Sequence, residues 1–542
     1  MSTIASTSCS TGRISRRSAL ALLVAAVIAA ACTASAPIAA TPSAGRTAPG
    51  VAALASLPPN AFQILHTNDI HGHLDATTAG RTVEQGGMAL LGGMIQLQRS
   101  RAPTRTLTLD AGDALSGTLI AAMDHGASMT KAMSLIGYDA QTIGNHDLDW
   151  GQQELAKRAA EASFPFLAAN VVESATGRPP AWATPYIVKD LGIARVGIIG
   201  LTYPSASIIK ATSTKGLVFL PGIESVRRYL PEVRRRADVV VVLSHLGIEG
   251  GTSRIAGGDT ALAGAVPGID LIIGGHDHIT LTTPRSVGPT MIFQAGAYGR
   301  ELGRVEVTVD PATRHVASVR TSNVILAVTT GAAAPLASVA ALVAQRRADA
   351  DKYGKRVVGT ASATFAADRD MNNALGELVA DALLDYGRRE GWRSDLAFYN
   401  AAGIRASIPR GDVTYERLAE VLPFQDTVVS VDLTGAQLRE VFEGMAGAAG
   451  RLFVSGATLA YRSSARVGDR VARATIAGQP LDPGRVYHVA TVDYLQGGGD
   501  GHTVFTQGSN VIYGDVDLDV VAAYLAARSP ISPVSAGRVT TE

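Results

Sequence analysis

The chain has 542 residues, which is too long for one hydrophobic core, so its length predicts two large domains. Hydrophobic residues make up 46% of it and charged residues 18%, which excludes an intrinsically disordered chain. The formal net charge is +1, with neither a basic stripe nor an acidic block, so a nucleic-acid polymer is not an expected partner.

Residues 1–36 have the composition of an export signal. Arg13, Arg16 and Arg17 precede an apolar run over residues 19–31, and residues 15–20 loosely fit a twin-arginine pattern. The run is shorter than the ~18–20 residues that span a bilayer. Residues 29–32 resemble a lipoprotein cleavage box, so lipid attachment at Cys32 is one expectation, and cleavage with release of a soluble protein is the other. Residues 37–59, rich in Ala, Ser, Thr and Pro, predict a flexible tether. The exported protein is expected in the cell envelope, either as a membrane-anchored lipoprotein or in a secreted or periplasmic form.

Residues 60–331 alternate β-rich apolar runs with helical patterns, which predicts a layered α/β domain. The strand-like runs are 62–66, 106–109, 194–200, 239–243, 269–273 and 291–294. An Ala-rich segment at 332–354 predicts a linking helix. Alternation then resumes, with predicted elements at 376–386, 396–399, 414–421, 428–433, 437–445 and 486–492, so residues 355–542 predict a second domain.

Five segments carry a possible metal ligand directly after an apolar run. Their candidate ligands are Asp69 and His71, Asp113, Asn145, His245, and His276 with His278. Because ligands gather outside the carboxyl ends of parallel strands, these side chains should converge on one edge of a sheet. Asp, Asn and His without Cys suit two ions such as Mn²⁺, Zn²⁺, Fe²⁺ or Co²⁺ that share a carboxylate. The sequence therefore predicts a two-metal hydrolase.

Each of these segments alone also has a purely structural explanation. Asp69 and Asp113 fit ordinary turns, and His245 fits a satisfied histidine at a strand end. Asp149 fits an N-cap for a helix that begins near Gly151. The GNHD segment at 144–147 is a stronger signal, because three side chains that can coordinate or hydrogen-bond follow one strand. A single metal centre explains all five segments, whereas the structural explanations require five independent coincidences.

The order of these motifs resembles that of the secreted 5′-nucleotidase family, within the calcineurin-like metallophosphoesterases. HTNDIHGHL at 66–74 and GNHD at 144–147 carry the resemblance, which covers about residues 62–506. It implies a four-layer α/β/β/α first domain, a linking helix, and an α+β second domain that binds substrate. It assigns one metal to Asp69, His71, Asp113 and His278, and the other to Asp113, Asn145, His245 and His276. It also makes His146 and Asp149 a catalytic dyad.

The resemblance further implies a nucleotide site in the second domain. Arg405 and Arg369 would bind the phosphate, Phe424 and Tyr494 would sandwich the base, Asn400 would contact the base, and Asp500 would accept from ribose hydroxyls. Ala401 and Ala402 stand where typical relatives have Gly, and Tyr494 replaces the Phe of many 5′-nucleotidases. The alternative for both aromatic rings is a place in the core.

The implied reaction is hydrolysis of nucleoside 5′-monophosphates by in-line attack of a hydroxide held between two ions. His146, oriented by Asp149, would be cationic and would donate a proton to the leaving group. Because the site is divided between two domains, we expect closure about the linking helix to bring substrate to the metals. The alternatives are a 2′,3′-cyclic-nucleotide phosphodiesterase or UDP-sugar hydrolase of the same fold, or a non-catalytic nucleoside-binding surface protein.

Overall fold

The computed structural model describes residues 54–79, 83–204, 209, 211–248, 258–322, 324–445, 450–462, 464–466 and 468–542. The predicted export signal, Cys32 and tether residues 37–53 lie outside the described residues. None of the helices in the described part of the chain has the length and apolar character of a membrane span.

The first domain contains two sheets, and this corrects the expectation that all the candidate ligands follow strands of a single sheet. The first sheet has parallel strands β1 (Ala61–Thr67), β4 (Thr106–Asp110), β5 (Ala140–Thr142) and β6 (Phe166–Leu167), extended by antiparallel β15 (Glu301–Val309), β16 (Val316–Val319) and β17 (Ile325–Ala327). The second has parallel β9 (Arg195–Leu201), β11 (Val239–Ser244), β12 (Leu271–Gly274) and β14 (Thr290–Phe293), with antiparallel edges β8 (Tyr186–Asp190) and β13 (Arg285–Val287). The two sheets supply the ligands jointly.

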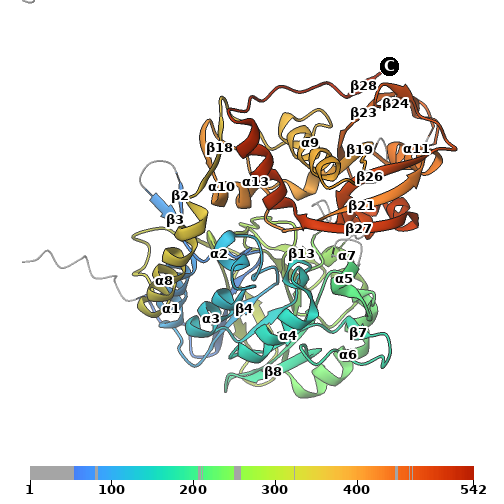
Figure 1. Ribbon diagram of the computed structural model, residues 1–542. Coiled ribbons are helices and arrows are strands. Elements are labelled where there is room, and N and C mark those ends of the chain that lie inside the picture. Colours follow the sequence, from blue (N-terminus) through green and yellow to red (C-terminus); the bar gives the residue numbers. More distant parts are fainter. Residues whose placement is uncertain are drawn as a thin grey trace, which may run out of the picture. The chain divides into compact units, whose positions relative to one another are not determined.

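The two sheets pack face to face because their strands are buried on both sides. Side chains such as Ile64 and Leu109 of the first sheet share a core with Val241 and Ile273 of the second. Helices α1 (Met88–Arg99) and α3 (Ala127–Ile136) cover the outer face of the first sheet, and α6 (Gly222–Arg236) and α7 (Gly258–Ala265) cover that of the second. The predicted α/β/β/α layering is confirmed (Figure 1).

The second domain is built on a five-stranded mixed sheet with its own core. Its strands run in the order β22 (Leu452–Ser455), β19 (Leu396–Asn400), β26 (Val486–Val492), β21 (Thr427–Thr434) and β27 (Ser509–Val516). Helix α9 (Ala374–Arg389) packs on β19 and β22. The other helices are α10 (Tyr415–Val421), α11 (Gly435–Met445), α12 (Asp493–Gln496) and α13 (Asp517–Arg528). A smaller sheet holds β25 (Gln479–Pro480), β24 (Val471–Ile476), β23 (Ala457–Tyr461) and β28 (Val539–Thr541).

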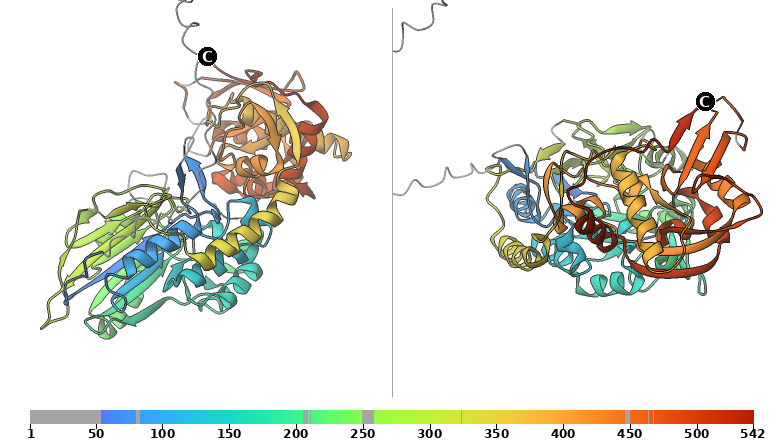
Figure 2. Two further views of the ribbon diagram at one scale, coloured as in Figure 1. Left: turned by 90° about the vertical axis from the view of Figure 1, so that its left-hand side faces the viewer. Right: turned by 45° about the horizontal axis from the view of Figure 1, so that its top comes forward.

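Helix α8 (Ala337–Gly354) joins the two domains and contacts both (Figure 2). It begins after Pro335, five residues later than the predicted segment, because proline and its preceding residue disfavour helix interiors. Its Arg347 donates to Asp75 of the first domain over 3.0 Å and to Glu416 of α10 over 2.5 Å. One guanidinium on the linking helix therefore binds carboxylates of both domains.

Candidate metal centre and substrate pocket

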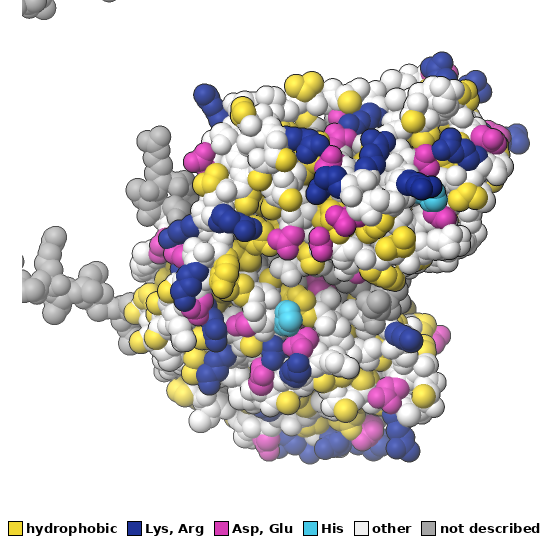
Figure 3. All heavy atoms as spheres, viewed as in Figure 1, with side chains coloured by type: hydrophobic (Ala, Val, Ile, Leu, Met, Phe, Trp, Pro, Cys, Tyr) yellow, Lys and Arg dark blue, Asp and Glu magenta, His cyan; other side chains and the backbone are white. Residues whose placement is uncertain are grey.

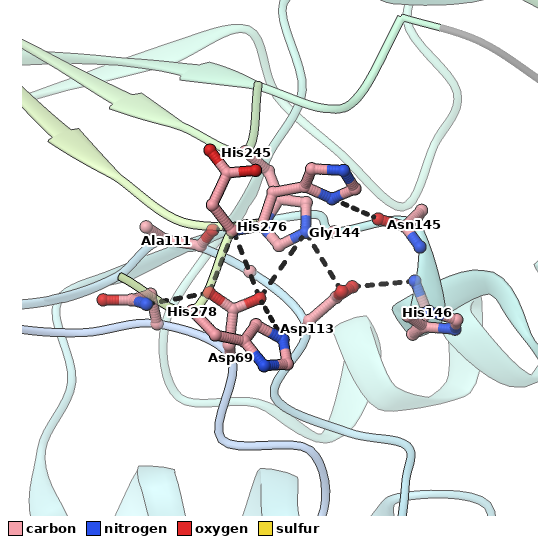
Figure 4. A network of polar contacts seen from close by, with 12 residues as sticks. Asp69, Ala111, Asp113, Gly144, Asn145, His146, His245, His276 and His278 are labelled. Atoms are coloured by element: carbon pink, nitrogen blue, oxygen red, sulfur yellow. Dashed lines mark hydrogen bonds and ion pairs between the residues drawn. The ribbon is translucent and has the colours of Figure 1, made fainter. Parts of the chain in front are cut away.

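Two groups of potential metal ligands lie at the carboxyl ends of the strands of both sheets (Figure 4). One group is Asp69, His71 and His278, and the other is Asp113, His245 and His276; within each, the ligand atoms lie within 4.8 Å of one another. Asn145 joins the second group, since its Oδ1 lies 3.1 Å from His276 Nδ1. All seven candidates predicted from the sequence are thus brought together.

Asp113 belongs to the second group but also faces the first. Its Oδ2 is 3.0 Å from His245 Nε2 and 3.8 Å from His71 Nε2, so one carboxylate oxygen faces a ring from each group. The two groups are therefore neighbours, and their arrangement matches a pair of cations that share a carboxylate.

Five of these residues have left-handed backbone. The φ angles are 51° at Asp69, 48° at His71, 56° at Asp113, 79° at His276 and 57° at His278. Such a conformation is uncommon outside glycine and costs on the order of 1–3 kcal/mol per residue. Hydrogen bonds between the loops hold it: the Asp69 amide donates to the Gly112 carbonyl over 2.9 Å, and the His71 amide to the Asp113 carbonyl over 2.8 Å. Strain gathered at these positions indicates a functional constraint.

Burial and neighbouring charges shift the pKa values of several residues in the two groups. Burial lowers the pKa of His276 and of His278 to about 3, so both rings are neutral and keep a lone pair near pH 7. Burial raises the pKa of Asp69 to about 7. Burial also acts to lower the pKa of His245, but the carboxylate of Asp113 raises it to about 10. The buried His245 Nε2 lies 3.0 Å from Asp113 Oδ2, so this ring nitrogen is directed at the carboxylate that faces both groups.

His146 and Asp149 lie beside the second group. His146 Nδ1 is 3.2 Å from both carboxylate oxygens of Asp149, and Ser116 Oγ donates to Asp149 Oδ2 over 2.6 Å. Burial opposes the positive charge of His146, but Asp149 and Asp113 outweigh it and raise the pKa of the ring. Asp149 does not cap α4 (Gly151–Glu161), whose N-cap is Trp150 and which has no side-chain cap. The capping alternative is therefore wrong.

A single pocket joins these groups to the second domain. Besides Asn145, His146, Asp149 and His276, it is lined by all six residues predicted to bind substrate, which are Arg369, Asn400, Arg405, Phe424, Tyr494 and Asp500. Phe424 and Tyr494 are half-buried and line the pocket, and Tyr494 also packs against the core of the second domain. Asn400 Oδ1 is buried without a hydrogen-bond partner among the described residues, which leaves an acceptor available to a ligand.

The comparisons with known proteins agree with this architecture. Residues 62–280 match the model of the calcineurin-like phosphoesterases, and residues 357–507 match that of the 5′-nucleotidase C-terminal domain. The crystal structure of a 5′-nucleotidase precursor from Thermus thermophilus is 30% identical, covers 89% of this chain and 99% of that one, and superposes with a TM-score of 0.76. The chain belongs to the 5′-nucleotidase family.

Other relatives of this 5′-nucleotidase family member are enzymes by name. The 5′-nucleotidase of Bos taurus is 29% identical over 560 residues, which cover 92% of this chain and 94% of that protein. The trifunctional nucleotide phosphoesterase protein YfkN of Bacillus subtilis is 28% identical over 88% of this chain. The chain spans only 34% of the length of YfkN. The predicted family and two-domain α/β fold are confirmed.

Two pocket residues of this family member were missed by the sequence analysis. Tyr203 has its ring centroid 4.5 Å from that of His276, and Asp426 follows Phe424 by two residues. Tyr203 lies just beyond the carboxyl end of β9, where the strand rule that located the metal ligands would have pointed to it. For Asp426, the only signal in the sequence was its position two residues after Phe424.

Proposed function

We propose that this 5′-nucleotidase family member is a metal-dependent 5′-nucleotidase, which hydrolyses nucleoside 5′-monophosphates to nucleoside and phosphate. The observation that carries the proposal is the composition of one pocket. It holds candidate metal ligands and the His146–Asp149 pair on the side of the first domain, and two arginines, two aromatic rings and three side-chain acceptors on the side of the second. An anion with an attached sugar and base satisfies these groups together.

In the proposed metal centre, Asp69, His71, Asp113 and His278 hold one divalent ion, and Asp113, Asn145, His245 and His276 hold the other. Mn²⁺, Zn²⁺, Co²⁺ and Fe²⁺ suit this donor set. When bound, two such ions lower the pKa of water toward ~7 and offset the charge of the phosphoryl oxygens. The neutral rings of His276 and His278 are already in the protonation state that coordination requires.

The proposed roles of the dyad and the arginines follow from their charge. Arg405 and Arg369 bind phosphate oxygens, because the guanidinium fork presents parallel N–H donors. His146 donates through Nδ1 to Asp149, and in the cationic form of the ring Nε2 also carries a proton, which passes to the leaving 5′-oxygen. Asp149, fixed by Ser116, keeps the ring oriented and favours its cationic form.

The nucleoside end of the proposed substrate contacts the second domain. Phe424 and Tyr494 stack on the base, and stacking of this kind tolerates different bases. Asn400 Oδ1 accepts from the base, and Asp500 accepts from the ribose hydroxyls. The Asp500 amide donates to Tyr494 Oη over 3.1 Å, which supports this pairing of base and ribose contacts by fixing the two side chains relative to each other.

Acidic and basic side chains are interspersed on the face of the described residues in Figure 3, which supports a small-molecule rather than a polymeric nucleic-acid partner.

We further propose that the protein is exported, by residues 1–36, and tethered to the cell envelope through lipid on Cys32. Cys32→Ser should release the protein from the membrane fraction, while Cys9→Ser, the matched control, should not. Retention of the Cys32→Ser protein on membranes would reject the lipid anchor.

The deciding experiment is phosphate release by the purified protein from AMP, UDP-glucose, 2′,3′-cyclic AMP and p-nitrophenyl phosphate, each with Mn²⁺, Zn²⁺ or EDTA. Metal-dependent turnover of AMP well above the others supports the proposal. A preference for the cyclic diester or the UDP-sugar moves the chain to those branches of the family. Two bound ions without turnover of any substrate favour a nucleoside-binding protein.

A further inference from the structure

Asp147 is a buried carboxylate directly behind the proposed metal centre. It is 2% exposed, and its two oxygens accept five hydrogen bonds. Oδ2 accepts from the amides of Gly144 (2.8 Å) and Asp113 (3.0 Å) and from Gln141 Nε2 (3.1 Å); Oδ1 accepts from the amides of Leu115 (3.0 Å) and Ala114 (3.1 Å). Both oxygens are therefore committed to the protein.

This places Asp147 apart from its two neighbours in the GNHD segment. Asn145 contacts His276, and His146 contacts Asp149, so both face the pocket. Asp147 belongs to neither group of ligand atoms and does not line the pocket. Of the three side chains in this segment that can coordinate or hydrogen-bond, Asp147 alone is directed at the backbone.

The amides that Asp147 binds belong to two different loops. Residues 113–115 follow β4 and carry Asp113, while Gly144 follows β5 and precedes Asn145. A further bond joins the same loops, since the His146 amide donates to Asp113 Oδ1 over 2.7 Å. Because Asp113 has a left-handed φ of 56°, its loop needs fixed partners to hold that shape, and charge-assisted bonds from one carboxylate supply them.

We propose that Asp147 is a positioning residue of the metal centre: it fixes the separation of Asp113 and Asn145, and so sets the affinity for the ion that they share with His245 and His276. The inference rests on the proposed function, because it requires that this group binds a divalent ion. Partners behind metal ligands typically change metal affinity 10–100-fold when they are removed.

Asp147→Asn tests this with little change in volume. The amide keeps one acceptor but turns an NH₂ group toward backbone N–H groups, so the two loops lose part of their common anchor. Titration of the metal-free protein with Mn²⁺ in a calorimeter should give two sites for the wild type. In the variant, one site should weaken by about 10–100-fold and the other should change less.

A matched control separates this effect from a general loss of stability. Glu443, in the second domain, is 8% exposed and accepts from the amides of Gly468 (3.1 Å), Arg470 (3.1 Å) and Val471 (2.7 Å). Glu443→Gln removes the same charge from the same kind of site, so it should lower the melting temperature without changing either Mn²⁺ affinity.

Gln141→Met serves if Asp147→Asn does not fold, because it removes a single donor from Asp147. It should weaken the same site by about two- to tenfold. The inference is overturned if Asp147→Asn folds and binds Mn²⁺ with two unchanged affinities. If Asp147→Asn does not fold, two unchanged affinities in a folded Gln141→Met overturn it. Equal weakening of the site in Glu443→Gln would also overturn it. If the wild type itself binds no Mn²⁺ or Zn²⁺, the proposed metal centre fails instead, so the two failures are distinguishable.

Discussion

The phenyl ring of Phe424 lies against the imidazole ring of His146, with centroids 4.5 Å apart and planes 14° apart. Arg405 Cζ lies 5.6 Å from the centre of the same phenyl ring. The ring proposed to stack on the base therefore contacts both the proposed proton donor and the proposed phosphate ligand. Phe424, which is proposed to bind substrate in the second domain, is thus in contact with His146, which is proposed to act in catalysis on the first.

We expect Phe424→Leu to raise KM for AMP by about 5- to 150-fold, because base stacking is worth ~1–3 kcal/mol. Turnover of p-nitrophenyl phosphate, which has no base, should change much less. Tyr353→Leu, at a 64% exposed aromatic residue of α8, is the control and should change neither. Equal losses on the two substrates would mean that Phe424 acts through His146 rather than on the base.

Asp149→Asn should lower kcat for AMP by about 10²–10⁴-fold, the usual contribution of a positioned acid or base. Asp149 raises the pKa of His146, so the alkaline limb of the kcat–pH profile should move to lower pH in the variant. Metal content, measured by elemental analysis, should stay at the wild-type value. An unshifted alkaline limb would remove His146 from the role of proton donor.

Chelation should lower both activity and stability. EDTA should abolish turnover and reduce the melting temperature, because ions that bind only the folded chain add about 2.7 kcal/mol at a concentration of 100 Kd. Mn²⁺ in excess should restore both in the same titration. A melting temperature that does not respond to EDTA would be inconsistent with two occupied sites in the folded protein.

His66 should make the metal-free protein sensitive to acid. It is fully buried, neither ring nitrogen has a hydrogen-bond partner in the part of the chain that the structure describes, and burial lowers its pKa to about 3. The unfolded chain, with a pKa near 6.5, binds the proton first, so stability falls as pH drops below that value. Between pH 7 and pH 5, the free energy of unfolding should fall by about 2 kcal/mol less in His66→Phe than in the wild type. Parallel pH profiles from chemical denaturation of both proteins would contradict this.

The sequence was sufficient to locate the metal-ligand candidates, because they follow strands with a strong apolar pattern. Asp69 follows β1, His245 follows β11, and His276 follows β12. The rule that ligands collect at the carboxyl ends of parallel strands needs only the strand positions. It did not distinguish one sheet from two, since strands buried on both faces give the same apolar run in either arrangement.

Other features depend on contacts that no local pattern encodes. Strand β15 pairs antiparallel with β1, more than 200 residues away in sequence, and Gly303 of β15 lies directly under the ring of His66. A Cβ at Gly303 would lie 2.0 Å from His66 Nε2, so that glycine is required by a close approach rather than by a turn.

His71 and His278 lie 207 residues apart in sequence and 3.1 Å apart at their Nε2 atoms. One follows a strand of the first sheet and the other a strand of the second, and His245 faces Asp113 across the same boundary. Neither sheet alone contains a complete set of ligands. A first domain whose sheets have formed but not yet docked therefore has no metal centre, so the acquisition of tightly bound metal would mark the docking of the two sheets and serve as a readout of it.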